Sequence, residues 1–273
     1  MRKLRIFLAA VSFTATTLLF LDTTGLLVPW CGWAARMQFL PAALSLRAFS
    51  WGALAVVAVT LGVTALMGRI YCSVVCPLGI FQDMVAWLRR LPGVRRVYGH
   101  GPARTKVRLV ALVTALAAGF CGFHFAVLAP YGIYGRALTV VVSPLARMGN
   151  NALAPWCHQH GWWVVKTLEV AFPAVAMMVA AGGMIVLVAL CALAGGRIWC
   201  NTVCPVGTIL GGVAKFAWLS PRIDAANCVH CGSCVRVCKA GCIDLKGGNV
   251  DKSRCVDCFN CSAVCRKGAI KWK

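Results

Sequence analysis

Acidic residues are scarce in this chain, and so are charged residues in general. Only 7 of the 273 residues are Asp or Glu, and charged residues make up 13% of the sequence. A soluble domain of ordinary composition is about 25% charged and about 45–50% apolar, whereas this chain is 60% hydrophobic. The composition therefore argues against an ordinary soluble domain and favours a protein that lies within a membrane.

Two haem signatures and a cleavable leader are also missing. No Cys-x2-Cys-His sequence occurs, which excludes a c-type haem. No pair of histidines falls within facing apolar runs, which argues against a b-type haem. The first apolar run, residues 6–30, is longer than the apolar core of a signal peptide. We therefore expect this run to remain in the protein as a membrane helix.

Four apolar runs are each close to the length that crosses a bilayer, about 20 residues of helix. They are residues 6–28, 49–67, 107–128 and 171–193.

The basic residues alternate with these runs. Three Lys or Arg precede the first run, eight lie in residues 69–108 and twelve in residues 197–273, against five in the two remaining loops. Because Lys and Arg accumulate on the cytoplasmic side, we predict a multi-pass protein of the bacterial cytoplasmic (inner) membrane with both termini in the cytoplasm. Topology then accounts for the net charge of +21, so we expect membrane lipid but no nucleic acid as a partner.

The membrane part contains an internal repeat. Gly-Arg-Ile-Tyr-Cys-Ser-Val-Val-Cys-Pro-Leu-Gly at residues 68–79 recurs as Gly-Arg-Ile-Trp-Cys-Asn-Thr-Val-Cys-Pro-Val-Gly at residues 196–207. Each copy follows an apolar run at its predicted cytoplasmic end. The four spans are therefore predicted to form two hairpins of the same design.

The C-terminal segment contains two four-cysteine runs of identical spacing. Each reads Cys-x2-Cys-x2-Cys-x3-Cys, and residues 228–245 resemble residues 255–272 throughout. In this pattern three thiolates of one run bind one [4Fe–4S] cluster, while the fourth reaches the other cluster. We predict a first cluster on Cys228, Cys231, Cys234 and Cys265, and a second cluster on Cys255, Cys258, Cys261 and Cys238.

Other interpretations of these cysteines fit less well. Zinc modules use separated pairs of Cys-x2-Cys, and disulfides are rare in the cytoplasm. Lys239 and Arg266 stand where such runs commonly have proline, so they place positive charge beside the clusters. Cys242, whose counterpart in the second run is Ala269, is predicted to be a small buried residue or an alternative ligand.

The predicted fold is therefore an α-helical integral membrane protein with four transmembrane helices in two repeated hairpins, followed by a C-terminal α+β two-cluster ferredoxin-like domain. Residues 1–215 form the membrane domain in this prediction, and residues 216–273 form the cytoplasmic domain.

The repeated membrane motifs each hold a Cys-x3-Cys-Pro sequence. Cys72 and Cys76, like Cys200 and Cys204, are four residues apart, so each pair would share one face of a helix. If the prolines instead begin new helices, the second cysteine of each pair lies at a helix N-terminus, where the dipole and a nearby arginine favour thiolate. Because the motif is doubled, we predict that the four thiols hold a further metal or cluster or act as redox thiols, rather than being merely buried.

On the predicted outer side, His158 and His160 flank Cys157. These histidines are candidate proton acceptors for a quinol or metal ligands, although histidines near Trp also anchor a chain at the interface. Cys157 and Cys31 can form a disulfide there if their geometry permits.

Two ionisable residues fall within predicted spans, Asp22 in the first and His124 in the third. Such groups are functional candidates. Asp22, near the outer end of its span, can instead simply reach the interface.

Taken together, the four spans, the doubled Cys-x3-Cys-Pro motif and the two-cluster tail resemble the NapH/NosR group of membrane polyferredoxins, over nearly the whole chain. This resemblance implies a membrane component of a quinol dehydrogenase, which takes electrons from quinol and passes them to a partner, a second iron–sulfur protein or a cytochrome, often of a periplasmic reductase system. The large flavin domain and additional spans of the nitrous-oxide-system relative are missing.

Two alternatives stay open from the sequence. A copper-reducing assembly factor for a respiratory oxidase shares the same motifs, and a regulatory membrane ferredoxin would contain them as well. The quinone type and the terminal acceptor are not encoded in any motif.

Overall fold

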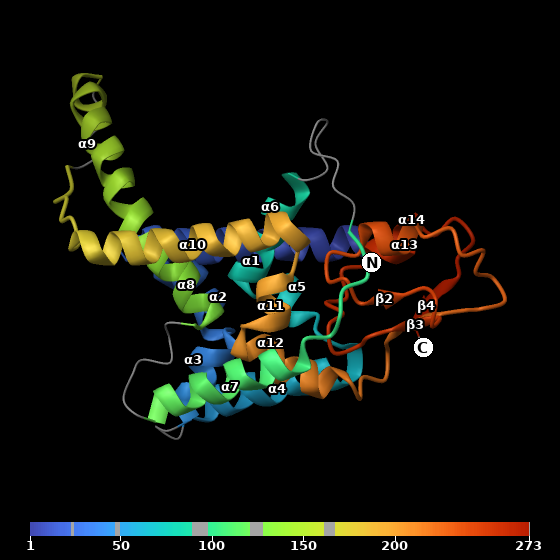
Figure 1. The fold of residues 1–273 in the computed structure, drawn as a ribbon. Helices are drawn as coiled ribbons and strands as arrows, with labels where there is room; N and C mark the ends of the chain where they lie inside the picture. The colour runs from blue at the N-terminus through green and yellow to red at the C-terminus, as the bar shows by residue number, and fades with distance from the viewer. Residues whose placement is uncertain (23–24, 47–49, 89–97, 121–127, 161–166, 273) are drawn as a thin grey trace.

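The computed structural model describes residues 1–22, 25–46, 50–88, 98–120, 128–160 and 167–272. This part of the chain is mostly helical, with a small strand-containing unit at the C-terminal end (Figure 1).

Two of the described helices are long and apolar enough to cross a membrane, α1 (Arg2–Leu21) and α10 (Val175–Gly195). A third apolar helix, α4 (Trp51–Met67), has 17 residues. The predicted third span corresponds to α7 (Thr105–Phe120), and residues 121–127 of that prediction, including His124, lie outside the described residues. Each of the four predicted runs thus corresponds to a helix, but only two of the described helices are long enough and apolar enough to cross a membrane.

The first helix ends earlier than the sequence pattern predicted. It stops at Leu21, and the Asp22 side chain then accepts hydrogen bonds from the backbone N–H groups of Gly25 and Leu27, at 3.0 and 2.8 Å. A carboxylate that bonds to the backbone a few residues ahead stabilises a turn. Asp22 therefore closes a turn in this structure instead of lying inside a continuous helix.

Each repeat continues after its long helix into two short helices. In the first repeat these are α5 (Tyr71–Val74) and α6 (Pro77–Leu88), and in the second they are α11 (Ile198–Thr202) and α12 (Pro205–Ala214). Helices α5, α11 and α12 lie between a layer containing α1 and α10 and a layer containing α4 and α7, whereas α6 extends past α10 (Figure 1).

The packing of the repeats is reciprocal. Helix α1 packs on α5 and α6, and α7 packs in the same way on α11 and α12. Across the repeats, α10 packs on α6 and α4 packs on α12. Each repeat therefore supplies the long helix that covers the proline-initiated helix of the other, and the two halves bury one shared core that includes Leu78, Val206 and Leu210.

The predicted outer loops are largely helical. The first contains α2 (Val28–Arg36) and α3 (Phe39–Ser45), and the second contains α8 (Pro130–Arg136), a π-helical turn η3 (Ala137–Val142) and α9 (Ser143–Gln159). The η3 turn packs against α1 and α10, and α8 packs against α6. Helix α9 projects away from the body at the end opposite the C-terminal unit (Figure 1).

The C-terminal unit has an approximate two-fold repeat of its own. Strand β1 (Pro221–Ile223) pairs antiparallel with β4 (Ile270–Trp272), and β2 (Ile243–Asp244) pairs with β3 (Asn249–Val250). The short helices α13 (Ser233–Val237) and α14 (Asn260–Val264) pack together. This α+β arrangement agrees with the predicted class of the tail.

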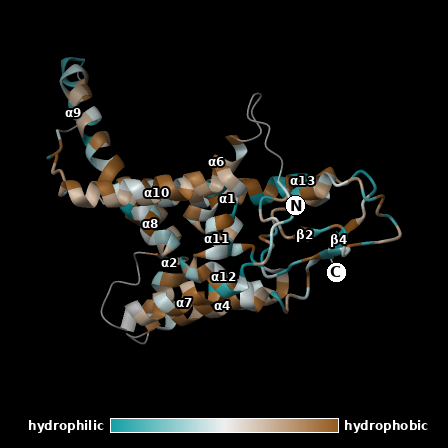
Figure 2. Ribbon diagram, viewed as in Figure 1, coloured by the Kyte–Doolittle hydropathy of each residue, from teal (hydrophilic) through white to brown (hydrophobic). Residues whose placement is uncertain are grey.

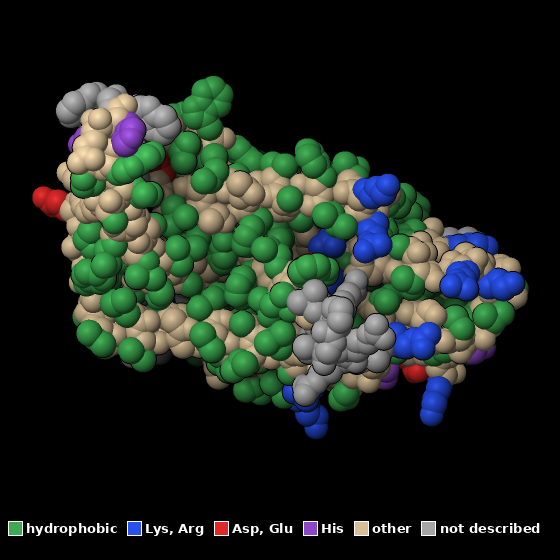
Figure 3. Space-filling model, turned by 90° about the horizontal axis from the view of Figure 1, so that it is seen from above, with side chains coloured by type: hydrophobic (Ala, Val, Ile, Leu, Met, Phe, Trp, Pro, Cys, Tyr) green, Lys and Arg blue, Asp and Glu red, His purple; other side chains and the backbone are tan. Residues whose placement is uncertain are grey.

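Polar and apolar surfaces are separated along the molecule. The long helices are predominantly hydrophobic, whereas the C-terminal unit carries many hydrophilic residues (Figure 2). Large apolar side chains are exposed on the long helices, for example Phe7 at 65%, Val59 at 63% and Val179 at 68%. Lys and Arg side chains gather at the end that holds the C-terminal unit (Figure 3).

Candidate functional site

The Cys-x3-Cys-Pro motifs are broken between their two cysteines. Cys72 lies in α5, but Pro77 begins the new helix α6, and Pro205 likewise begins α12. The residue before proline is disfavoured in helical conformation, and Cys204 accordingly has an extended conformation, with φ −64° and ψ 119°. The prediction that each pair shares one helical face is therefore wrong, and the alternative of a new helix starting at the proline is confirmed.

A cysteine side chain caps the N-terminus of α12. The Cys204 side chain accepts a hydrogen bond from the backbone N–H of Gly207, at 3.4 Å. The first N–H groups of a helix have no partner within it, so a sulfur at this position takes the place of the usual capping oxygen.

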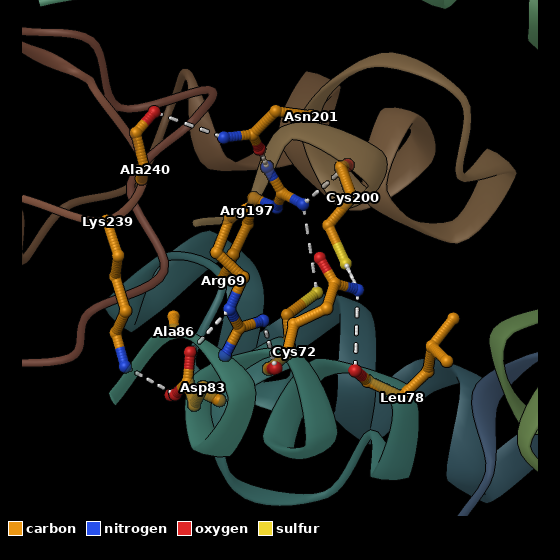
Figure 4. Close-up of polar contacts among 12 residues, drawn as sticks. Arg69, Cys72, Leu78, Asp83, Ala86, Arg197, Cys200, Asn201, Lys239 and Ala240 are labelled. Carbon is orange, nitrogen blue, oxygen red and sulfur yellow. Dashed lines mark hydrogen bonds and ion pairs between the residues drawn. The ribbon is translucent and has the colours of Figure 1, made fainter. Parts of the chain in front are cut away.

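The arginine of each motif crosses to the other repeat. Arg197 donates from Nη1 to the backbone carbonyl of Cys72 at 2.7 Å, and Arg69 donates from Nη2 to the backbone carbonyl of Cys200 at 3.4 Å. Both arginines are almost completely buried, at 1% and 0% exposure. These exchanged contacts hold the two motifs face to face (Figure 4).

Glycine is required where the motifs meet. A Cβ on Gly79 would collide with the carbonyl of Cys72 and approach Arg197 Nη1, and a Cβ on Gly207 would collide with the carbonyl of Cys200 and approach Arg69 Nη2. The final Gly of each repeated sequence thus leaves room for the crossing arginine, which explains its place in both copies.

The four motif thiols are buried at the junction of the repeats. Gln82 donates to the sulfur of Cys200 at 3.1 Å, and an Arg69 nitrogen lies 3.9 Å from the sulfur of Cys72. Burial raises the pKa of the Cys76 thiol, and the nearby thiols of Cys72 and Cys200 raise it further. The structure therefore brings thiols from both motifs into one buried group.

A buried ion-pair cluster lies beside these thiols and breaks the symmetry of the repeats. Asp83 on α6 pairs with Arg5, Arg197 and Lys239, with N–O distances of 2.6, 2.7 and 2.5 Å. Burial alone would raise the pKa of Asp83, but the three cations hold this pKa well below the usual range. The equivalent position in the second repeat is Gly211, against which the guanidinium of an arginine packs instead.

The C-terminal unit rests directly on the repeated motifs (Figure 4). The backbone N–H of Arg197 donates to the carbonyl of Lys239 at 2.8 Å, and Asn201 donates to the carbonyl of Ala240 at 3.3 Å. Arg69 donates to the carbonyl of Ser253 at 2.9 Å. The motif arginines thus join the two repeats to each other and to the tail.

The predicted cluster ligands gather in two separate groups within the tail. One cavity, of about 800 Å³, is lined by all four cysteines predicted for the first cluster, which are Cys228, Cys231, Cys234 and Cys265. A smaller cavity is lined by all four cysteines predicted for the second cluster, which are Cys238, Cys255, Cys258 and Cys261. In each cavity the fourth cysteine comes from the other run, as crossed ligation requires.

The backbone around these cysteines has the shape of an anion-binding loop. His230 and Asp257 occupy equivalent positions within the two runs, and both have positive φ, 51° and 45°. Non-glycine residues rarely adopt this conformation, but it turns successive N–H groups towards one point, as in many iron–sulfur sites. Within the described residues, no group of three or more Cys, His, Asp or Glu is arranged to hold a single metal ion.

Cys242 is a fifth thiol at the second cavity. It is 2% exposed, and its sulfur lies 3.5 Å from the sulfur of Cys238. It also contacts the thiol of Cys255. The prediction of a small buried residue is confirmed, and the structure adds that its neighbours are two of the predicted ligands.

The predicted outer residues lie far from this site. His158 and His160 belong to the C-terminal end of α9, at the opposite end of the molecule from the tail (Figure 1). His160 contacts the carbonyl of Trp156 through Nδ1 at 2.9 Å. Cys31 on α2 and Cys157 on α9 are both free thiols.

Sequence reasoning missed the ion-pair cluster. Asp83, Arg5 and Lys239 come from three segments that are far apart along the chain, and no local spacing connects them. The one feature of the sequence that pointed to Asp83 is that acidic residues are so few. Asp83 is one of 7 acidic residues and lies directly after a repeated motif, within a basic stretch.

The family described as "4Fe-4S binding domain" matches two segments of the chain, residues 49–95 and 176–224. Each segment contains one Cys-x3-Cys-Pro motif, and neither reaches Cys228. The match therefore covers the two repeated motifs and stops before the tail cysteines. Among curated proteins, the chain is similar to the ferredoxin-type proteins NapH and MauN.

Curated proteins similar to this chain include two methylamine utilization ferredoxin-type proteins MauN. The protein of Paracoccus denitrificans is 28% identical over 174 residues, and that of Methylobacillus flagellatus is 26% identical over the same length, which is 63% of this chain and 48% of each relative. The ferredoxin-type protein NapH of Haemophilus influenzae is 25% identical over 171 residues, 62% of this chain and 47% of the relative. The chain thus spans about half the length of the curated relatives it matches. No solved structure matches it.

Proposed function

We propose that this chain is the membrane electron-transfer subunit of a quinol dehydrogenase. It takes electrons from quinol and passes them through [4Fe–4S] clusters to a partner redox protein, either an iron–sulfur protein or a cytochrome. Its similarity to ferredoxin-type proteins supports the electron-transfer part of this proposal. The observation that carries it is the separation of the eight predicted cluster ligands into two cavities, with four of these ligands lining each.

In this proposal each cavity of the tail holds one [4Fe–4S] cluster through its four cysteines. The clusters supply one-electron redox chemistry when bound. The first would be held by Cys228, Cys231, Cys234 and Cys265, and the second by Cys255, Cys258, Cys261 and Cys238. The left-handed backbone at His230 and Asp257 supports this assignment, because N–H groups directed at the site stabilise its negative charge.

The second cavity is the one nearer to the repeated motifs. Val256 and Cys258, on its rim, pack into the same hydrophobic core as Cys72 and Cys204. Lys239, which follows Cys238, pairs with Asp83. Electrons that leave the membrane part would therefore enter the tail at the second cluster and continue to the first.

We propose four membrane spans with both termini in the cytoplasm. Helices α1 and α10 have the length and apolarity of spans, and α4 and α7 both pack on α12. The N-terminus lies at the same end as the tail, where Lys and Arg are gathered (Figures 1 and 3). This asymmetry follows the positive-inside rule. Residues 1–215 would form the membrane domain and residues 216–273 the cytoplasmic domain.

We propose that the thiols of Cys72, Cys76, Cys200 and Cys204 hold a further iron–sulfur cluster at the edge of the membrane, since no described group of three or more Cys, His, Asp or Glu is arranged for a single metal ion. Two buried guanidinium groups, of Arg69 and Arg197, lie beside them. Burial raises the pKa of the Cys72 thiol, and the charges of Arg69 and Arg197 partly offset this. The cysteine ligands of iron–sulfur clusters are thiolates. The match of both motifs to a 4Fe-4S binding family supports a cluster over four inert side chains.

The test uses the purified full chain under anaerobic conditions. A reduced short-chain quinol should bleach the visible iron–sulfur absorbance, whereas Cys72→Ala and Cys200→Ala should slow this reduction. If both substitutions leave the rate unchanged, the motif thiols are structural. If quinol reduces no cluster while the protein reduces added copper, the chain is instead a copper-reducing assembly factor.

A further inference from the structure

A cavity of about 750 Å³ lies between α1 and α6. One wall is the first half of α1, with Ile6, Ala10 and Phe13, and the other is α6, with Ile80 and Phe81. Small-molecule sites commonly have volumes of about 300–1,000 Å³, apolar walls and a few fixed polar groups. The size and lining of this cavity suit a molecule with a long apolar part.

The polar groups of this cavity belong to the buried ion-pair cluster. Arg5 and Asp83 line it together with Lys239, and Arg2 lies on its rim. The Asp83 carboxylate is 2.6 Å from Arg5 and 2.5 Å from Lys239. These four side chains carry three positive charges and one negative charge. The polar end of the cavity is therefore net positive but contains a fixed carboxylate.

The cavity also reaches the predicted second cluster site. Lys239 and Asn260 both line it. Lys239 directly follows Cys238, and Asn260 directly precedes Cys261. A molecule in the cavity would thus be one residue away from two of the four cysteines that line the second tail cavity.

We propose that this cavity binds the quinol, with the ring at Asp83 and Lys239 and the isoprenoid tail along α1. This assignment rests on the proposed function, and it names the place where the quinol of that function would bind. A phospholipid phosphate would also meet this net positive end, so the lipid is an outcome that the test must distinguish. A quinol is favoured because its oxidation requires an electron acceptor within reach, and the cavity borders the second cluster site through Lys239 and Asn260.

Oxidation of the quinol here would break its two O–H bonds and release two protons to water at the end of the cavity next to the C-terminal unit, leaving quinone. Cys238, Cys255, Cys258 and Cys261 would hold the cluster that accepts one electron at a time. The first electron would have to pass on to the first cluster and the partner protein before the second could follow. Net positive charge stabilises the quinolate anion after the first proton has left, and Asp83 acts as a positioning residue that holds Arg5 and Lys239 at the ring.

This site differs from the one that the outer histidines would form. His158 and His160 lie on α9 at the far end of the molecule (Figure 1). A quinol oxidised there would have to send electrons along the whole membrane part. From a quinol in the cavity between α1 and α6, electrons would have to pass only from the ring beside Lys239 to the cluster site at the neighbouring Cys238.

The experiment is photolabelling of the full chain, in lipid nanodiscs, with an azido-quinone. Labelled peptides are mapped by mass spectrometry, with unlabelled short-chain quinone as competitor. Ala10→Trp fills the cavity without changing charge. Val11→Trp, one residue further on, is the matched control because Val11 is exposed and does not line the cavity. Iron content and visible spectrum, measured for both variants, report whether the tail still assembles.

The label is expected on residues 6–14 or 80–88, reduced at least about fivefold by Ala10→Trp and unchanged by Val11→Trp. Label on α9, label that Ala10→Trp does not affect, no label, or label displaced by anionic phospholipid but not by quinone would each overturn the site. Quinol reduction of the wild-type clusters, measured in parallel, tests the proposed function separately. If reduction occurs but the label lies elsewhere, the function stands and this site fails.

Discussion

Asp83 on α6 forms an ion pair with Lys239 of the cysteine-rich tail, with 2.5 Å between Oδ2 and Nζ, and both side chains are at most 10% exposed. This contact joins a residue that follows the first repeated motif to the residue after a predicted cluster ligand. Arg5 and Arg197 share the same carboxylate. One acidic side chain therefore connects the first long helix, both repeats and the tail.

Replacing Asp83 with Asn should loosen the tail from the membrane part. Removing one partner of a buried ion pair leaves buried charge unpaired, which costs about 3–5 kcal/mol. We expect a lower melting temperature and faster proteolysis between α12 and β1. Asp224→Asn is the control, because Asp224 pairs with Lys271 at the surface, and it should change little. Equal effects of the two substitutions would contradict the structural role of Asp83.

Replacing Gly79 with Ala should disturb the junction of the repeats. The added methyl group collides with the Cys72 carbonyl and displaces Arg197, and overpacking of this kind costs about 1–3 kcal/mol. Gly212→Ala is the matched control, because nothing lies within 4 Å of a Cβ there and Ala is favoured over Gly in a helix. Thermal unfolding in detergent should show a loss for Gly79→Ala only. A loss of similar size for both would mean that the crossing arginine does not set the requirement for glycine.

Cys242→Ala should leave both tail clusters in place and lower the reduction potential of the second one. The Cys242 sulfur lies 3.5 Å from that of Cys238, and hydrogen bonds to ligand sulfurs raise cluster potentials. The reciprocal change, Ala269→Cys, should raise the potential of the first cluster. Redox titration followed by EPR measures both. Loss of about four iron atoms from Cys242→Ala would instead identify Cys242 as a ligand.

Reporter fusions at the C-terminus should be active only with a reporter that works in the cytoplasm. The 28 Lys and Arg residues are distributed in favour of that side, and the N-terminus lies at the tail end of the molecule (Figure 1). Fusions after α9 should show the opposite pattern. Periplasmic reporter activity at the C-terminus would invert the proposed topology and move the tail to the other side of the membrane.

Local patterns in the sequence predicted much of this structure. The doubled motif predicted two similar halves, and the spacing of the tail cysteines predicted which four would line each cavity. Both features are set by residues that are close together in the sequence. The site around Asp83 depends on partners that are 78 or more residues away from it along the chain, and no local sequence pattern connects residues so far apart. The helices α8 and α9 were also not predicted as such, because their polar and apolar residues mark an interface without specifying a helix.

The most direct test of the account compares Cys238→Ala with Cys265→Ala in the full chain, reduced anaerobically with quinol and examined by EPR. Cys238 belongs to the first run but lines the second cavity, and Cys265 belongs to the second run but lines the first cavity. We predict that Cys238→Ala abolishes quinol-dependent reduction by removing the second cluster. Cys265→Ala should remove the first cluster and leave quinol reduction of the second intact. The reverse pattern, or reduction of the remaining cluster in both variants at equal rates, would contradict entry of electrons at the second cluster.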